Sequence, residues 1–269
     1  MLKSRIITAT LLIITVLAVI FYAPPLFQAA FILLICLVSG HEWLRMIAAK
    51  TPQKILFYDV LIFCAVVFYY MPPTAESVLW FSVVGWIFAL AAVIAYQKNR
   101  AFVNASYVWR NTLIGLWLIV PMFASLFLLL TINPTLLIFL LILIWSCDIF
   151  AFFAGRRFGK HLLASRVSPG KSIEGAIGAF IGAGILAFIL LKVLLPEENL
   201  FALWILSLVI IPVTIIGDLF ESVIKRIFNI KDSGQILPGH GGALDRLDSL
   251  TAAAPIFAFV YFILLGSGI

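Results

Sequence analysis

Apolar residues run through this chain in segments too long for the core elements of a soluble domain. Hydrophobic residues make up 64% of its 269 residues and charged residues 11%, whereas about a quarter of a soluble domain is charged. Apolar runs of roughly 18 residues or more recur from end to end, and such runs predict membrane-spanning helices. We therefore expect an all-α, polytopic integral membrane protein with about nine spans, over residues 5–22, 26–47, 54–71, 76–96, 112–131, 134–154, 173–195, 200–227 and 249–267.

Lysine and arginine fall in alternate connections between these spans. With the N-terminus in the cytoplasm, 17 of the 18 basic residues lie on the cytoplasmic side and only Lys192 lies outside. Because cytoplasmic loops are enriched in Lys and Arg, this asymmetry predicts a cytoplasmic N-terminus and an external C-terminus. The net charge of +6 then faces anionic lipid headgroups of the bilayer, and we expect no nucleic acid as a partner.

The organisation predicts a single transmembrane catalytic domain over residues 1–269, because no linker, repeat or low-complexity stretch interrupts it. Spans within about 1–131 are expected to be scaffold, and those within about 134–269 to carry the site. The first run has no A-x-A motif before Pro24, which favours an uncleaved span over a signal peptide. The three cysteines, Cys36, Cys64 and Cys147, lie in apolar runs without metal-ligand spacing, so we expect neither a disulfide nor a metal site there.

One long polar stretch, Gly217 to Asp248, interrupts the apolar pattern. Its first part places Asp218, Glu221, Ser222 and Lys225 three or four residues apart, so that they would share one face of a helix. Glu221 and Lys225 also have the spacing of an ordinary i,i+4 helix pair, and Glu221 is therefore left out of the predicted site.

A glycine-rich loop, Gly239 to Gly242, follows and is closed by Asp245, Arg246 and Asp248. Backbone amides together with Lys and Arg suit phosphate groups, and paired carboxylates suit Mg²⁺. The stretch therefore predicts a phosphoryl- or nucleotidyl-transfer site set into a membrane protein.

Three pieces of this stretch form a contiguous pattern: Ser222-x-x-Lys225-Arg226, Lys231-Asp232-x-Gly234, and Pro238-x-His240-Gly241-Gly242-x-x-Asp245-Arg246-x-Asp248. The pattern resembles the signature of the phosphatidate cytidylyltransferase (CDP-diacylglycerol synthase) family, which also lies just before the last span. Ser168-Pro169-Gly170-Lys171 and the chain length fit as well. The resemblance implies an enzyme of a bacterial cytoplasmic (inner) membrane that transfers the cytidylyl group of CTP to phosphatidate, giving CDP-diacylglycerol and pyrophosphate for phospholipid biosynthesis.

Site roles follow from the resemblance and from the charges. Asp218 and Asp245 are expected to hold Mg²⁺, with a second cation possible, because bare carboxylates in a membrane are costly; pairing with Lys225 and Arg246 is the alternative. The predicted catalytic residues are Asp218, Asp245, Lys231, His240 and Arg246. The predicted substrate-binding residues are Ser168, Lys171, Ser222, Lys225, Arg226, Asp232, Gly241, Gly242, Asp248 and Asp148.

The implied reaction requires little covalent chemistry from the protein itself. The phosphate of phosphatidate is already largely anionic near neutral pH, so no Ser or Cys nucleophile and no strong base is required. Basic side chains would screen the repulsion between the two substrates and stabilise pyrophosphate. His240 would orient a phosphate or protonate the leaving group.

Two upstream segments allow more than one interpretation. Asp148, inside an apolar run, would face a wet cavity that supports the site or pair with Arg156 or Arg157. Ser168 would cap the seventh span with Pro169 in its first turn, and that helix N-terminus with Lys171 would bind an anion. The segment is not a Walker A loop, because position 165 is not the required glycine.

Several features stay open at this level. His41, Glu42 and Asp59 suit either a function or an ordinary interfacial position. Gly178 and Gly182 form a GxxxG motif that favours close helix contact within the chain, with a homodimer as the alternative. A CTP-dependent lipid kinase of the dolichol-kinase type, or less favourably a secondary transporter, are the competing functions; clustering of polar residues at one face favours an enzyme.

Overall fold

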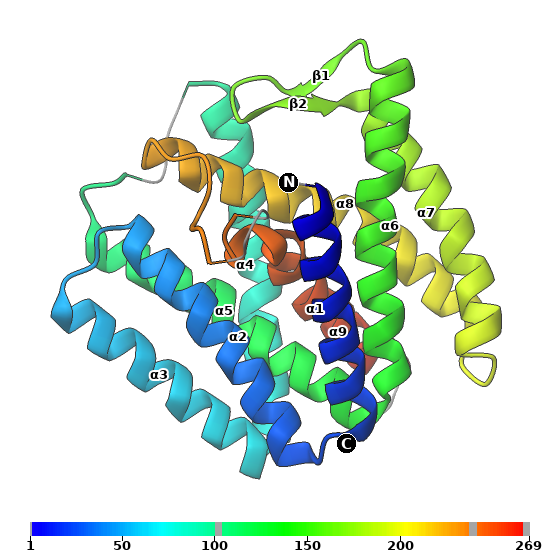
Figure 1. The fold of residues 1–269 in the computed structure, drawn as a ribbon, viewed down its shortest axis with the longest axis horizontal. Helices are drawn as coiled ribbons and strands as arrows, with labels where there is room; N and C mark the ends of the chain where they lie inside the picture. The colour runs from blue at the N-terminus through cyan, green and yellow to red at the C-terminus, as the bar shows by residue number, and fades with distance from the viewer. Residues whose placement is uncertain (1, 100–103, 237–240, 266–269) are drawn as a thin grey trace.

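The computed structural model describes residues 2–99, 104–236 and 241–265, and among these the side chains of 10–99, 104–236 and 241–262. It confirms an all-α architecture: nine helices lie within the described ranges (Figure 1). They are α1 (Leu2–Tyr22), α2 (Pro25–Met46), α3 (Thr51–Tyr70), α4 (Pro73–Gln97), α5 (Val108–Ile132), α6 (Pro134–Phe158), α7 (Ile173–Leu194), α8 (Leu200–Ile227) and α9 (Asp248–Leu265).

Proline and capping residues set where many of these helices begin. Four helices, α2, α3, α4 and α6, carry proline at their first or second position, where its missing N–H is not needed and its fixed φ suits the first turn. Asn133 and Asn199 cap α6 and α8 through their side chains. The connections before these helices, at 23–24, 47–50, 71–72, 133 and 195–199, are therefore short.

Seven of the described helices, α2 to α8, are long and apolar enough to cross a membrane. The described apolar parts of α1 and α9, Thr10–Tyr22 and Asp248–Phe262, are shorter. A polytopic membrane protein is thus confirmed, while the count of nine spans stays a prediction.

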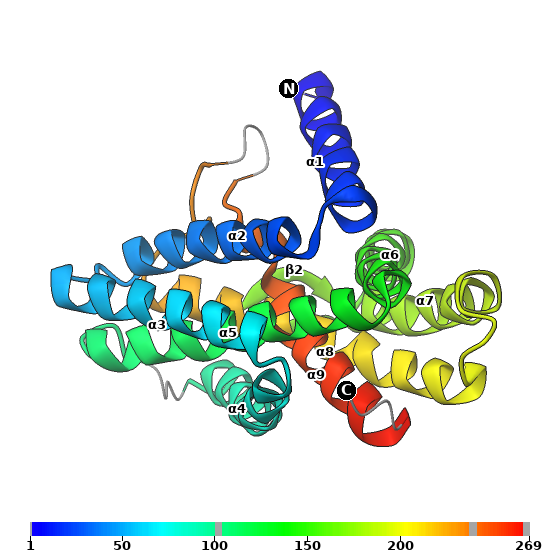
Figure 2. The ribbon, with the colours of Figure 1, turned by 90° about the horizontal axis from the view of Figure 1, so that it is seen from below.

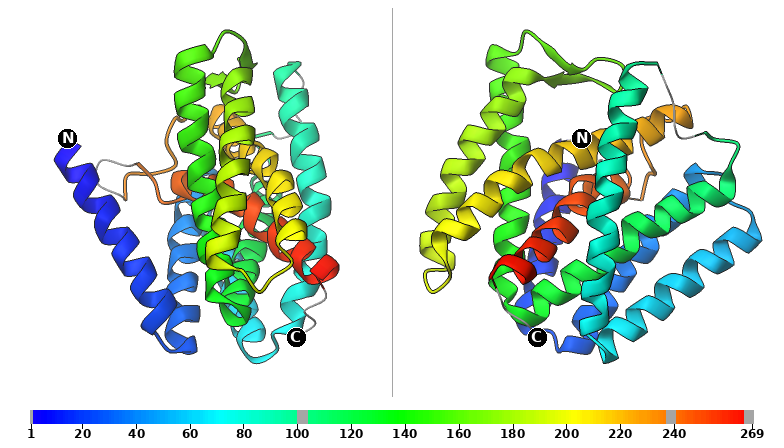
Figure 3. Two further views of the ribbon diagram at one scale, coloured as in Figure 1. Left: turned by 90° about the vertical axis from the view of Figure 1, so that its right-hand side faces the viewer. Right: turned by 180° about the vertical axis from the view of Figure 1, so that it is seen from behind.

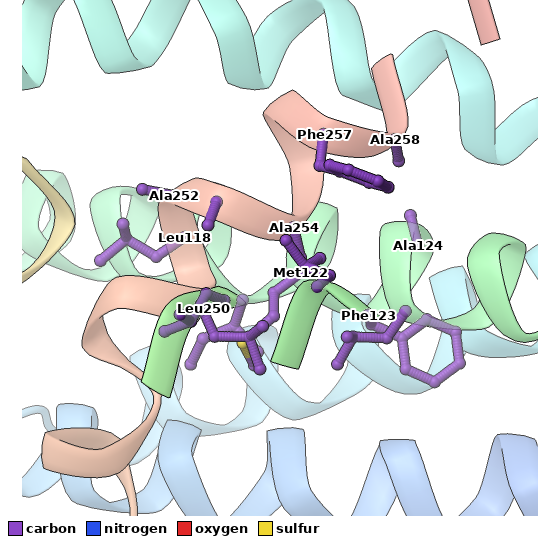
Figure 4. Close-up of a cluster of buried hydrophobic side chains, with 14 of the residues drawn as sticks. Leu118, Met122, Phe123, Ala124, Leu250, Ala252, Ala254, Phe257 and Ala258 are labelled. Carbon is purple, nitrogen blue, oxygen red and sulfur yellow. The ribbon is translucent and has the colours of Figure 1, made fainter. Parts of the chain in front are cut away.

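The core is organised around α5, in which 83% of the apolar window is buried, against 44% or less in the other six. Its residues Met122 and Ala124 face the small and aromatic residues of α9, among them Ala254 and Phe257 (Figure 4). Alanines let two backbones approach closely. Around this pair lie α2 and α3 on one side and α6 and α7 on the other, while α1 projects from the bundle (Figures 1 and 2).

The GxxxG motif of α7 packs against α6 of the same chain. A Cβ at position 178 would lie 2.1 Å from Cβ of Ala154, and one at position 182 would lie 2.5 Å from the ring of Phe150. Only glycine permits this approach. The structure therefore supports the packing within one chain that the motif favoured.

A β-hairpin of β1 (Leu162–Ala164) and β2 (Ser168–Ser172) joins α6 to α7, at the top of Figure 1. The prediction that Ser168 caps the seventh helix is wrong, because Ser168 begins β2. Ser172 is the cap, and its Oγ accepts a hydrogen bond from the backbone N of Gly175 at 3.1 Å. Extended backbone up to position 172 removes Pro169 from any first helical turn.

The hairpin is fastened to α4 and α8. Gln97, the last residue of α4, donates from Nε2 to Ser165 Oγ at 2.9 Å and accepts from the backbone N of Arg166 at 3.2 Å. Arg226 Nε donates to the carbonyl of Val167 at 3.2 Å. Figure 3 shows the hairpin spanning from α6 and α7 to the end of α4. The polar segments that contain Lys171 and Lys225 therefore meet at one end of the bundle.

Candidate active site

Asp218 lies in the second half of α8 and contacts residues of two elements. Its Oδ2 is paired with Nζ of Lys171 on β2, and its Oδ1 accepts a hydrogen bond from Ser222 Oγ at 3.3 Å, one turn along α8. The hydrogen bond confirms that these positions share a face. Lys171 thus joins the hairpin directly to the predicted carboxylate.

Asp245 lies in a short 3₁₀ turn, η1 (Leu244–Arg246), just before α9. It accepts hydrogen bonds from Lys225 Nζ at 2.8 Å, from the backbone N of Ser233 at 2.9 Å and from that of Gly242 at 3.0 Å. Partial burial opposes its ionisation, but the hydrogen bond and charge of Lys225 and the two amides outweigh burial and lower its pKa. Asp245 is therefore held as a carboxylate that organises the loop around it.

Lys225 also contacts a second carboxyl group, that of Glu221. Its Nζ lies 3.4 Å from Oε1 of Glu221 in the expected i,i+4 arrangement. The predicted helix pair is therefore confirmed, but Glu221 is buried, with 4% of its surface exposed, and it lies at the centre from which the spacing argument left it out. The polar face of α8 is thus turned inward, and Glu221 lies buried beside Lys225 at the centre.

Asp148 of α6 borders a cavity of about 330 Å³ between α6, α7, α8 and the hairpin, whose lining includes Lys171, Ser172 and Arg156. No ion pair of the described residues joins Asp148 to Arg156 or Arg157. Its charge instead interacts with those of Asp218, Lys171 and Arg246. The structure thus favours the cavity over the ion pair with its own helix.

The other predicted residues lie around this centre at varying distance from it. Lys231 and Asp232 are exposed on the connection after α8, and Arg226 is exposed at the end of α8. Ser168 is half-buried in β2. His240 lies outside the described residues. No contact of the described chain brings Lys231 or Asp232 to Asp218.

The start of α9 and the loop before it complete the centre. Asp248 accepts a hydrogen bond at Oδ1 from the backbone N of Ser249 at 2.6 Å and interacts electrostatically with Asp218, Lys225 and Lys171. Gly241 has a φ of +87°, which an L-residue rarely adopts. Gly242 is buried beside Asp245.

Sequence reasoning left Glu42 of α2 open, and the structure places it at the loop. Its Oε2 accepts hydrogen bonds from Ser233 Oγ at 3.0 Å and from the backbone N of Leu244 at 2.8 Å. His41 is instead exposed, with Nδ1 3.2 Å from the hydroxyl of Tyr58, and Asp59 is exposed. The only sequence signal for Glu42 was an acidic residue inside an apolar run.

The donor chemistry of the centre fits a divalent cation of the Mg²⁺ type. No group of three or more His, Cys, Asp or Glu residues within the described ranges surrounds one point, but Mg²⁺ commonly uses one or two carboxylates and completes its shell with water and substrate phosphates. Five carboxyl groups and three basic groups interact electrostatically here, so oxygen donors and phosphate-binding cations lie together at the centre. They are Asp148, Asp218, Glu221, Asp245 and Asp248, with Lys171, Lys225 and Arg246.

Comparison with known proteins shows the family of the chain. A model of the cytidylyltransferase family matches residues 3–264. Proteins named phosphatidate cytidylyltransferase are similar to the chain: that of Haemophilus influenzae is 35% identical over 98% of this chain and 100% of its own. That of Pseudomonas aeruginosa is 38% identical over 96% of both chains, and that of Thermotoga maritima is 42% identical over 45% of this chain and 47% of its own. The chain belongs to the cytidylyltransferase family.

Proposed function

We propose that the protein is a phosphatidate cytidylyltransferase, which joins CTP and phosphatidate to give CDP-diacylglycerol and pyrophosphate for phospholipid biosynthesis. The similarity to phosphatidate cytidylyltransferases over nearly the full length supports this assignment. One structural observation supports it further: the signature residues Lys225 and Asp245 lie with Asp218 of α8 and Lys171 of the hairpin in one charged centre beside a cavity.

The reaction is a displacement at phosphorus. A phosphate oxygen of phosphatidate attacks the α-phosphorus of CTP, a new P–O bond forms, and the bond to the β,γ-diphosphate breaks with its electron pair leaving on pyrophosphate. Both reactants are anions, so the main barrier that the protein must lower is charge repulsion. The lipid phosphate supplies its own nucleophilic oxygen, which explains why no Ser or Cys nucleophile is needed.

Lys171 and Lys225 are the basic residues best placed to lower this barrier. Lys171 lies where the cavity meets Asp218, so its ammonium can bind a phosphate that enters the cavity. Lys225 keeps Asp245 ionised and the loop amides in place. Asp218 and Asp245 would hold Mg²⁺, which when bound supplies further neutralisation of the substrate phosphates.

The predicted orientation gives both substrates access to this centre. The connections between α2 and α3 and between α4 and α5, the hairpin and the segment after α8 are basic, and we place them on the cytoplasmic face of a bacterial inner membrane. CTP would enter from the cytoplasm, and phosphatidate would enter laterally from the bilayer. The GxxxG face is used within the chain and gives no support to a homodimer.

Transfer of label from CTP tests the function. Purified protein in mixed micelles would be incubated with phosphatidate and CTP labelled at either the α- or the γ-phosphorus. We expect α-label in the lipid product and γ-label in pyrophosphate. A CTP-dependent lipid kinase would instead move γ-label to lipid and release CDP, and that result would replace the assignment.

A further inference from the structure

Glu42 links the scaffold helices to the glycine-rich loop. It lies near the end of α2 with 1% of its surface exposed. Both hydrogen bonds to its Oε2 come from the loop, from Ser233 Oγ at 3.0 Å and from the backbone N of Leu244 at 2.8 Å. Ser233 and Leu244 are the two ends of the segment 233–244, so one carboxylate from a distant helix holds both ends of this loop.

The loop backbone is packed directly against this carboxylate. A Cβ at position 234 would lie 2.2 Å from Oε1 of Glu42, and one at position 242 would lie 2.7 Å from its Oε2. Atoms at these distances overlap, so the approach of Glu42 requires glycine at position 234, whereas at position 242 the nearest atom is Ser233 Oγ at 2.0 Å. Oε1 is itself buried without a hydrogen-bond partner among the described residues, which makes the position costly to keep for stability alone.

The residues held by Glu42 are the ones that hold Asp245. The backbone N of Ser233 donates to Asp245 at 2.9 Å, while its Oγ donates to Glu42. Leu244, bonded to Glu42, immediately precedes Asp245, and Gly242 lies between the two carboxylates. A displacement of Glu42 would therefore displace Asp245 and the loop amides together.

We infer that Glu42 is a positioning residue for the transfer reaction: its buried carboxylate fixes Ser233 and Leu244 and so sets the place of Asp245. This inference rests on the proposed function and adds a residue of α2 to its machinery. A misplacement of about 1 Å at a reacting centre can cost about a hundredfold in rate. We therefore expect the loss of Glu42 to lower the rate of the reaction more than the loss of an ordinary buried hydrogen bond would.

The first test compares substitutions at position 42 under saturating substrates, with kcat expressed per folded molecule. Glu42→Ala is expected to lower kcat by about a hundredfold. Glu42→Gln should retain most of the activity, because an amide oxygen in place of Oε2 can accept both hydrogen bonds. The KM for CTP should change much less, because Lys171 lies on the hairpin, outside the loop. Asp59→Ala, which removes an exposed carboxylate from α3, is the matched control and should leave kcat unchanged.

The second test uses the contact with Gly234 as an independent probe. Gly234→Ala is expected to lower kcat strongly in the wild-type background, because the new methyl group would push against Oε1. In the Glu42→Ala background the same substitution should have little further effect, since the clash is gone. This non-additivity is the sign of direct contact, and a helix that merely needed Glu42 for folding would not produce it.

Any of three outcomes overturns the inference. Folded Glu42→Ala could have the kcat of the wild-type protein, or Glu42→Gln could have a kcat as low as that of Glu42→Ala. Gly234→Ala could also lower kcat equally in the wild-type and Glu42→Ala backgrounds. If Glu42→Ala does not fold, Glu42→Asp replaces it, because a shorter side chain withdraws the carboxylate. Glu42→Asp should then itself lower kcat, and Gly234→Ala should have little further effect in that background; wild-type kcat in Glu42→Asp, or an equal effect of Gly234→Ala in both backgrounds, would contradict the proposal. Failure of the proposed function is separate, because the wild-type protein itself would then form no CDP-diacylglycerol.

Discussion

At the scale of single residues, the charge of Asp218 decides whether the centre can assemble. Its carboxylate pairs with Lys171 and accepts from Ser222, and Asp218→Asn keeps the shape while removing the charge. We expect turnover to fall by about a hundredfold or more, since charge stabilisation is usually the largest single contribution to such a reaction. The variant should still insert and purify. Activity measured across a Mg²⁺ titration checks this, and near-normal activity at low Mg²⁺ would remove Asp218 from the metal site.

Asp245 gives a prediction about pH. Its folded-state pKa lies below the ordinary value of about 3.9, because Lys225 and the loop amides outweigh its burial. A lowered pKa stabilises the folded state above the unfolded pKa, and that stability is lost as the pH falls through the folded pKa. Asp245→Asn should therefore unfold more easily by about 2 kcal/mol at neutral pH, with the difference shrinking below about pH 4.

Thermal unfolding in mild detergent at several pH values measures this difference. Asp59→Asn, at an exposed carboxylate, is the control and should match the wild-type protein throughout. A difference between Asp245→Asn and wild type that stays constant into acid would show that the charge of Asp245 is not what stabilises the loop.

The site residues also show which contacts could be predicted from the sequence and which could not. Asp218, Ser222 and Lys225 were predictable because helical spacing alone puts them on one face. Glu42 was not, because its partners are 191 and 202 residues away along the chain, and no local pattern encodes such a contact. Lys171 was predicted as a substrate-binding residue, but its pairing with Asp218 depends on how the hairpin folds back over α8.

At the scale of elements, apolar length and proline placed the helices well, and the hairpin was missed for a physical reason. Its strands are three and five residues long, β2 contains Pro169 and Gly170, and one register irregularity separates Leu162 from Ala164. Alternation of apolar and polar residues cannot develop in so short a stretch. The cap was consequently predicted at Ser168 instead of Ser172.

The hairpin depends on Gln97 for its attachment to α4. Gln97→Ala removes the hydrogen bonds to Ser165 and Arg166. If the loss is about 1 kcal/mol, local opening of the hairpin should become about fivefold more frequent. Hydrogen–deuterium exchange of peptides over 162–172 measures this. Ser165→Ala, which removes one of the two bonds, should give a smaller effect, and unchanged exchange in Gln97→Ala would show that the tip is held elsewhere.

Packing between α6 and α7 gives a prediction with a matched control. Gly178→Ala would place a methyl group 2.1 Å from that of Ala154, whereas Gly184→Ala meets the flexible end of Leu208 at 2.9 Å. Both changes bring the same gain in helix propensity, so the clash alone separates them. We expect Gly178→Ala to be less stable than Gly184→Ala by about 1–3 kcal/mol in thermal unfolding. Adding Ala154→Gly should restore stability, and failure to do so would argue against this contact.

At the scale of the whole molecule, the charged centre is assembled from distant parts of one membrane bundle. Glu42 comes from α2, Asp148 from α6, Lys171 from the hairpin, and Asp218 and Asp245 from α8 and the turn before α9. Glu42 also shows that α2, which lies in the part of the chain predicted to be scaffold, contacts the segment that carries the signature.

Topology is the prediction that joins the centre to the membrane. The apolar runs predict nine spans and the positive-inside asymmetry predicts a cytoplasmic N-terminus, while α1 and α9 have shorter apolar parts within the described residues than the other helices. Single cysteines at Asn104, Ser165 and Asp232, in a variant without Cys36, Cys64 and Cys147, should react with an impermeant maleimide only after the cells are opened. A cysteine at Glu197 should react in intact cells, and a reporter fused after Ile269 should report an external position.

Gln97 and Ser165 are hydrogen-bonded, so labels on the α4–α5 connection and the hairpin must agree. A cytoplasmic reporter after Ile269 would mean that one of the nine helices does not cross, and labelling at Ser165 in intact cells would place the whole charged centre on the wrong side for CTP.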